Sequence, residues 1–161
     1  MATTMSSTRV KISSAESDDP AILVAVDRAT AELRRGGPVV LHDRTARVWL
    51  VVAAETVEDE GLARLQAMGE GDPHLVLTAE RAAALGLGQR AADVVSLLLP
   101  ARLPADALWH LADPTAPQLA SAPAGLTRSE VPVDIAIAVV ELAKLARLLP
   151  AAIVAPLRLQ S

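Results

Sequence analysis

The stretch ARVWLVVAA, residues 46–54, is apolar at almost every position. A strand with one solvent-facing side would carry a polar residue at every second position, so this segment predicts a strand covered on both faces. The preceding PVVLH, residues 38–42, predicts a neighbouring strand, and only the charged loop Asp43 to Arg47 separates the two. The chain is therefore expected to form a sheet with helices on each side.

Helical and strand patterns alternate along the rest of the chain. The first helix is expected from Pro20 to Gly36 with Asp19 as its cap, and its buried stripe consists of Ile22, Leu23, Val26 and Leu33. The last helix, from about Pro132 to Leu148, has a stripe of Ile135, Ala138, Leu142, Leu145 and Leu149. Between them are expected a helix opened by Thr56, a strand HLVLT, a short helix from Thr78 to Gly86, a strand DVVSLLLP, a short helix in LPADALWHLAD and a loop over residues 114–132.

This alternation predicts an α/β (α+β) fold, a single three-layer domain with a mixed twisted sheet over residues 20–157. Residues 1–19 are polar and rich in Ser and Thr, and we expect a disordered tail there. AAIVAPL predicts a final strand, followed by residues 158–161 as a C-terminal end or a linker to a missing domain. A strand at so apolar an end would leave backbone groups exposed at a sheet edge or beside a missing neighbour, which suggests a partner. The alternative is that Ile153 to Leu157 complete the core of a self-sufficient monomer.

Composition excludes several classes of function. The formal net charge of −4 and the absence of Phe and Tyr argue against nucleic-acid binding. Without Cys there is no disulfide and no thiolate metal site, which suits the cytoplasm. The most apolar segment, near the C-terminus, is interrupted by charged residues and Pro150, so no membrane association is expected.

Candidate chemistry is sparse. His42 and Asp43 stand together at a strand end, where α/β sheets present ligands, and Arg44, Arg47 or Arg128 could hold a phosphate. These five residues form a candidate weak ligand site. His74 and His110 have no second ligand at helical spacing. Residue patterns alone thus predict no catalytic residue, no cofactor site and no metal site.

Three segments, in the right order, resemble one enzyme family. VDRATAELRRGGPVVLHDRTARVWLVVAAE is similar to the opening of 3,4-dihydroxy-2-butanone 4-phosphate synthase, a dimeric enzyme of riboflavin biosynthesis. LVLTAERAAALGL resembles that family's ALTEERADRLGL, and ELAKLARLLPAAIVAPL resembles its DLARLAGLKPAAVICEI. The resemblance covers roughly half of the chain and implies the family's fold.

The departures from this family bear on activity. The family's acidic loop DDEDRENEGD, which supplies metal-binding and acid/base carboxylates, is shortened here to HDRTAR. Ile135 stands where the motif GHTEA brings a metal-binding histidine, and Pro156 stands where the family has the Glu of ICE. A two-cation site on a sugar phosphate needs several oxygen ligands. The resemblance therefore implies a degenerate site.

The pattern looks most like riboflavin proteins of high-GC bacteria, in which a degenerate synthase-like domain precedes a GTP cyclohydrolase II domain. The zinc of that second domain is held by cysteines, so zinc is expected only in the missing cyclohydrolase domain. We expect a non-catalytic domain with a structural or assembly role, whose partner is a second copy or a C-terminal cyclohydrolase domain. The alternatives are a phosphate-binding module and an active synthase that converts ribulose 5-phosphate with magnesium.

Overall fold

Strand β3 (Val48–Ala53) lies inside the sheet, as its apolar pattern predicts. The computed structural model describes residues 9–10, 19–87, 93–100, 103–116 and 125–159. In it β3 pairs in antiparallel fashion with β2 (Val39–His42) on one side and with β7 (Ala151–Pro156) on the other. Every residue of β3 from Trp49 onward is buried.

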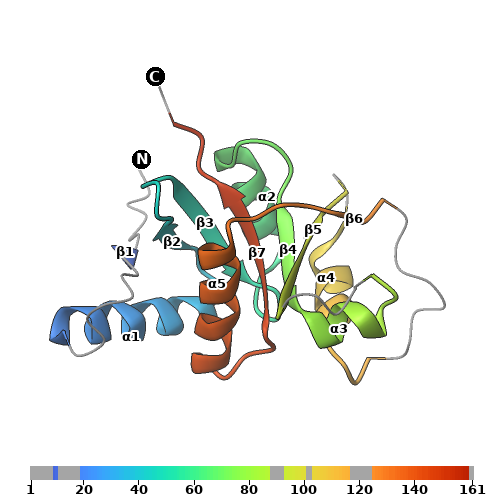
Figure 1. The fold of residues 1–161 in the computed structure, drawn as a ribbon, viewed down its shortest axis with the longest axis horizontal. Coiled ribbons are helices and arrows are strands. Elements are labelled where there is room, and N and C mark those ends of the chain that lie inside the picture. Colours follow the sequence, from blue (N-terminus) through green and yellow to red (C-terminus); the bar gives the residue numbers. More distant parts are fainter. Residues whose placement is uncertain (1–8, 11–18, 88–92, 101–102, 117–124, 160–161) are drawn as a thin grey trace.

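The sheet has seven strands in the order β1-β2-β3-β7-β4-β5-β6 (Figure 1). Its remaining members are β1 (Arg9–Val10), β4 (His74–Thr78), β5 (Val94–Leu98) and β6 (Thr127–Arg128). Only β1 and β2 run parallel, and all other neighbours are antiparallel. The predicted mixed sheet is confirmed.

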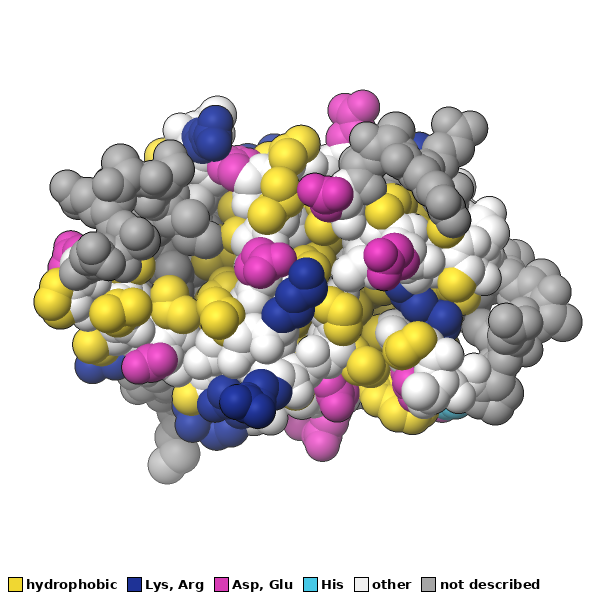
Figure 2. All heavy atoms as spheres, turned by 60° about the horizontal axis from the view of Figure 1, so that its bottom comes forward, with side chains coloured by type: hydrophobic (Ala, Val, Ile, Leu, Met, Phe, Trp, Pro, Cys, Tyr) yellow, Lys and Arg dark blue, Asp and Glu magenta, His cyan; other side chains and the backbone are white. Residues whose placement is uncertain are grey.

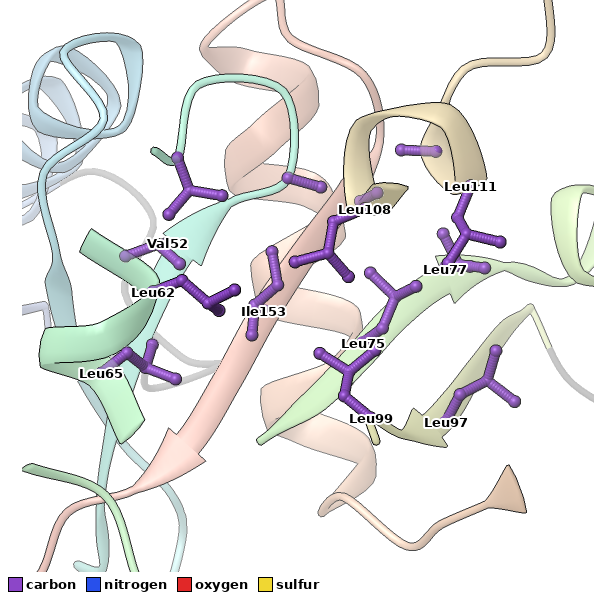
Figure 3. Packing of buried hydrophobic residues seen from close by; sticks show 14 of the residues in the cluster. Val52, Leu62, Leu65, Leu75, Leu77, Leu97, Leu99, Leu108, Leu111 and Ile153 are labelled. Carbon is purple, nitrogen blue, oxygen red and sulfur yellow. The ribbon is translucent and has the colours of Figure 1, made fainter. Parts of the chain in front are cut away.

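Helices cover both faces of this sheet. On one face lie α1 (Pro20–Arg34) and α5 (Val133–Leu145), and on the other α2 (Asp59–Met68), α3 (Ala79–Ala84) and α4 (Ala105–Ala112). Neighbouring residues of β7 point to opposite faces of the sheet. Val154 packs in the cluster under α1 and α5, whereas Ile153 packs in the cluster under α2, α3 and α4. Figure 3 shows Ile153 between Leu62 of α2 and Leu75 of β4. The predicted three-layer architecture is confirmed.

Two helices begin and end where the sequence predicts. The Asp19 carboxylate accepts a hydrogen bond from the Ala21 amide and caps α1, and the Thr78 hydroxyl accepts one from the Arg81 amide and caps α3. Gly36, with φ of +79°, follows the end of α1. A Cβ there would stand 2.6 Å from the Thr56 carbonyl oxygen, so the chain passes too close for a side chain.

The prediction that Thr56 opens a helix is wrong. Helix α2 begins at Asp59, and the Thr56 hydroxyl instead donates a hydrogen bond to the Leu33 carbonyl at the end of α1, at 2.5 Å. Thr56 was a plausible cap because its hydroxyl can satisfy a free backbone group. The group that it satisfies belongs to another element.

Two predicted core residues face solvent. Leu23 is 56% exposed and Leu145 is 59% exposed. The buried residues of α1, namely Ala29, Thr30 and Leu33, lie in its C-terminal half, and Ala25 and Val26 are partly buried against the same core. Leu145 occupies the last turn of α5, on the side turned away from the sheet.

The sequence patterns do not predict two short strands, β1 and β6. Within the tail that is expected to be disordered, Arg9–Val10 form β1, while residues 1–8 and 11–18 lie outside the described residues. Thr127–Arg128 form β6 within the predicted loop 114–132, of which residues 117–124 are likewise outside. Such short strands join a sheet through backbone hydrogen bonds, which leave little side-chain pattern.

The predicted final strand exists as β7, but its predicted place at an exposed edge is wrong. It lies between β3 and β4 and is buried throughout. Arg158 and Leu159 follow it and are exposed, and residues 160–161 are outside the described part. In the described ranges, no helix is both long and apolar enough to cross a bilayer.

Candidate functional site

One end of the sheet gathers four of the five candidate residues. His42 ends β2 and is partly buried, and Asp43, Arg44 and Arg47 lie in the turn to β3. Helix α5 begins beside this turn, because the Arg44 amide donates a hydrogen bond to Asp134 Oδ2 at 3.0 Å. The sequence places the turn correctly but does not indicate this contact, which joins residues 90 positions apart.

The Asp43 carboxylate organises the turn. Its Oδ1 accepts hydrogen bonds from the Thr45 amide at 2.8 Å, the Thr45 hydroxyl at 2.6 Å and the Arg47 amide at 3.0 Å. Its Oδ2 accepts one from the Trp49 indole Nε1 at 3.1 Å. Ala46 has a φ of +64°, a left-handed conformation that closes the turn. Both oxygens of Asp43 are thus engaged within the protein.

These bonds set the pKa of Asp43. Burial raises the pKa, but hydrogen bonds from Thr45, Trp49 and Arg47 favour the charged form and hold it below its ordinary value. Because the pKa is lower in the folded protein than in the unfolded chain, ionised Asp43 stabilises the fold above the unfolded value. That contribution is lost as pH falls through the folded pKa.

Replacing Asp43 by Ala is expected to lower the free energy of unfolding by about 2 kcal/mol at neutral pH, since several donors lose their acceptor. The difference between wild type and D43A should shrink as pH falls below about 4, where the wild-type carboxylate becomes protonated. Urea unfolding across this pH range measures both quantities. A difference that stays constant with pH would contradict a role for the ionised carboxylate.

Arg47 is already paired within the protein. Its Nη2 lies 3.2 Å from Glu70 Oε2, and its guanidinium lies 5.6 Å from the centre of the Trp49 ring, a cation–π arrangement. Trp49 itself is only 3% exposed. The cation that was predicted to meet a phosphate therefore has an acidic and an aromatic neighbour.

His74 and Ser129 meet at the same end of the sheet. His74 Nδ1 lies 2.8 Å from Ser129 Oγ, and the His74 ring centre lies 6.4 Å from that of Trp49. Burial lowers the pKa of His74, and the nearby Asp72 charge only partly opposes this. Neutral His74 thus fastens the segment between β6 and α5 to the start of β4, a pairing across 55 positions that the sequence does not indicate.

Arg128 does not join this group. It lies on β6, which forms the opposite edge of the sheet from β1, and five strand spacings separate β6 from β2. At typical spacing this is about 24 Å. The five candidate residues therefore do not form one site. Arg128 was included because its side chain can bind a phosphate, and the sequence does not reveal its place in the sheet.

Ile135 and Pro156 both lie near the turn. Ile135, in the first turn of α5, is 2% exposed and belongs to the same core cluster as Trp49 and Val154. Pro156 ends β7 directly opposite Trp49 on β3. The positions that the family resemblance assigns to a metal-binding histidine and to a carboxylate thus lie at the same end of the sheet. In the part of the chain that the structure describes, no three His, Asp or Glu side chains gather to hold a metal ion.

Comparison with known proteins supports a relationship to two riboflavin-pathway enzymes. No family model matches the chain. The chain is 43% identical over 139 residues to a GTP cyclohydrolase-2 from Azospirillum brasilense. The aligned region covers 86% of this chain and 36% of that protein. The chain therefore spans about a third of the length of this relative.

Solved structures match the fold. RibBX, a two-domain 3,4-dihydroxy-2-butanone 4-phosphate synthase from A. baumannii, superposes with a TM-score of 0.64 at 21% identity, over 84% of this chain and 48% of that one. A 3,4-dihydroxy-2-butanone 4-phosphate synthase in complex with two magnesium ions has a TM-score of 0.58 at 23% identity, over 82% and 74%. This chain therefore has the fold of 3,4-dihydroxy-2-butanone 4-phosphate synthase and is related in sequence to part of a GTP cyclohydrolase-2.

Proposed function

We propose that this chain is a non-catalytic synthase-like domain of a riboflavin-biosynthesis protein of the GTP cyclohydrolase II type, with a structural or assembly role. The observation that carries the proposal is the end of the sheet at the β2–β3 turn. There both Asp43 oxygens bind the turn and Trp49, while Ile135 and Pro156 offer no oxygen ligand. A degenerate site is what this arrangement favours.

Magnesium chemistry does not fit these residues. Magnesium requires near-octahedral oxygen coordination, usually by carboxylates and water. Asp43 could become a ligand only by giving up hydrogen bonds to Thr45, Arg47 or Trp49, which would open the turn. Aliphatic Ile135 and the Pro156 ring supply no second ligand. The buried indole of Trp49 also occupies space beside the turn.

The two other functions receive less support. A phosphate-binding module would need converging cations, but Arg47 pairs with Glu70 and Arg128 lies at the far edge of the sheet. An active synthase would need new ligands for the magnesium ions that the solved relative binds. We therefore favour an assembly role over phosphate binding and over synthase activity. In that role the partner is a second copy or a cyclohydrolase domain. Zinc would belong to that domain, and the cytoplasm remains the expected location.

Titration of magnesium into the purified chain tests the proposal. Isothermal calorimetry is expected to give no saturable heat, either with the chain alone or with ribulose 5-phosphate present. The matched control is D43A, which should give the same flat titration because Asp43 holds a turn and no metal. Saturable binding to wild type that D43A abolishes would contradict the proposed function.

A further inference from the structure

Strand β6 forms one edge of the sheet but covers only part of its neighbour β5. It pairs with Leu97 and Leu98, and beyond it the Ser129 amide donates a hydrogen bond to the Ser96 carbonyl at 3.0 Å. The chain then leads to α5. Within the described ranges, no strand pairs with Val94 on the side of β5 that faces away from β4. This part of β5 is an open sheet edge.

Val94 directs its backbone groups to this open edge. Successive residues of an antiparallel strand point their N–H and C=O groups to alternate sides. The Asp93 carbonyl faces β4, because it accepts a hydrogen bond from the Ala79 amide at 3.0 Å, whereas the Ser96 carbonyl faces β6. Val94 follows Asp93 by one residue and precedes Ser96 by two, so its N–H and C=O point away from β4. An added strand could bind both groups.

A groove of about 960 Å³ lies between this edge and α5. Val133 and Ile137 line it on the helix side, and a spacing of four residues brings both to one side of α5. They are 70% and 43% exposed. The side chain of Val94 lies on this face of the sheet, since it packs against the core beneath α1 and α5. A residue opposite Val94 in an added strand would point the same way and meet an apolar wall.

The surface around the start of β5 is acidic. The groove and a second hollow that shares Asp93 are lined by four carboxylates, those of Glu80, Asp93, Glu130 and Glu141. Two cations line the same hollows, Arg128 and Lys144. Arg128 pairs opposite Leu97, three residues beyond Val94 and about 10 Å along β5, and Lys144 lies 3.2 Å from Glu141. Figure 2, which turns the lower side of Figure 1 forward, shows acidic side chains among hydrophobic ones on the side that it displays.

We propose that the open edge of β5 binds an extended peptide segment of a partner protein, in which apolar residues alternate with basic ones. The segment runs antiparallel to β5, as β6 does, and occupies the position that β6 leaves uncovered. The residue opposite Val94 exchanges two backbone hydrogen bonds with it and points its apolar side chain at Val133 and Ile137.

The neighbouring residues of the segment point to the other side of the strand, because side chains alternate. Asp93 likewise points away from the side of Val94, which it directly precedes, so a basic residue of the segment comes to lie beside its carboxylate. The net acidic surface around the start of β5 favours the same partner. The proposal goes beyond the structural role proposed above and does not involve the β2–β3 turn.

Calorimetric titration with the synthetic peptide acetyl-Lys-Val-Lys-Val-Lys-amide tests the site. Wild type is expected to bind it saturably, with a dissociation constant below about 1 mM. Two matched probes separate the contributions. Replacing the three lysines by glutamates reverses the charge, and N-methylation of both valines removes the backbone donors. Each change should raise the dissociation constant at least about tenfold, because one loses the charge complementarity and the other the added strand.

Protein variants locate the site on the molecule. V94P removes the donor that faces the open edge, where an edge strand tolerates proline, and should weaken binding at least about tenfold. I137K places a charge in the apolar wall and should do the same, which keeps the test informative if V94P does not fold. The matched control is L23K, because Leu23 is an exposed apolar residue of another helix, α1 (56% against 43% for Ile137). L23K should bind as wild type does, and circular dichroism checks that each variant is folded.

Four results would each overturn the proposal. They are no saturable binding of the lysine peptide to wild type, equal affinity for the lysine and glutamate peptides, unchanged affinity for the N-methylated peptide, and equal losses in I137K and L23K. Magnesium binding or synthase turnover would contradict the proposed function without affecting these results.

Discussion

Replacing Trp49 by Ala is expected to lower the free energy of unfolding by about 4 kcal/mol, the scale for removing a buried aromatic side chain. Trp49 is 3% exposed, contributes to the core beneath α5 and donates its indole hydrogen bond to Asp43. The substitution therefore creates a cavity and leaves Asp43 Oδ2 without its donor. Urea unfolding with the fluorescence of the remaining tryptophan, Trp109, measures the loss.

W49F separates packing from the hydrogen bond. Phenylalanine keeps most of the buried ring but cannot donate to Asp43, so we expect a loss of about 2 kcal/mol. In D43A the indole has already lost its acceptor, so the same W49F substitution should cost less there. Equal losses in the two backgrounds would show that the indole and the carboxylate do not act together.

Replacing Ile153 by Ala is expected to lower the free energy of unfolding by about 3 kcal/mol. Ile153 is fully buried in β7, which pairs with both β3 and β4, and Figure 3 shows it among leucines from several elements. The surrounding strands and helices prevent the cavity from closing. Chemical denaturation of the purified variant measures the loss.

Leu159 provides the matched control near the same end of the chain. It lies three residues beyond β7 and is 77% exposed. L159A should change the free energy of unfolding by less than about 0.5 kcal/mol, as usual for surface substitutions. A small effect of I153A, similar to that of L159A, would contradict a central position for β7.

Local patterns were enough to predict most elements and the layers. The continuous apolar run at β3 identified a strand covered on both faces, and Gly36 and Thr78 marked helix ends through backbone needs that act within a few residues. The order of the strands in the sheet could not be predicted from these local patterns. An apolar C-terminal segment predicts a strand, but only long-range pairing places β7 between β3 and β4.

The candidate site was predicted in part for the same reason. His42, Asp43, Arg44 and Arg47 are neighbours in sequence and remain so at the β2–β3 turn. The contacts that define the site cross the chain, such as Asp134 with Arg44 and Ser129 with His74. Nothing in either local sequence specifies its distant partner. The position of Trp49 beside the turn could have been predicted, because Trp49 lies at the start of the strand that follows the turn, seven residues after His42.

We propose that this synthase-like domain does not perform the synthase reaction. The most direct measurement is the turnover of ribulose 5-phosphate by the purified chain with magnesium, compared with a protein-free blank and with a sample containing a chelator. We predict the same rate in all three, because Asp43 is engaged in the turn and Ile135 and Pro156 supply no ligand. Saturable, chelator-sensitive product formation above the blank would contradict the account.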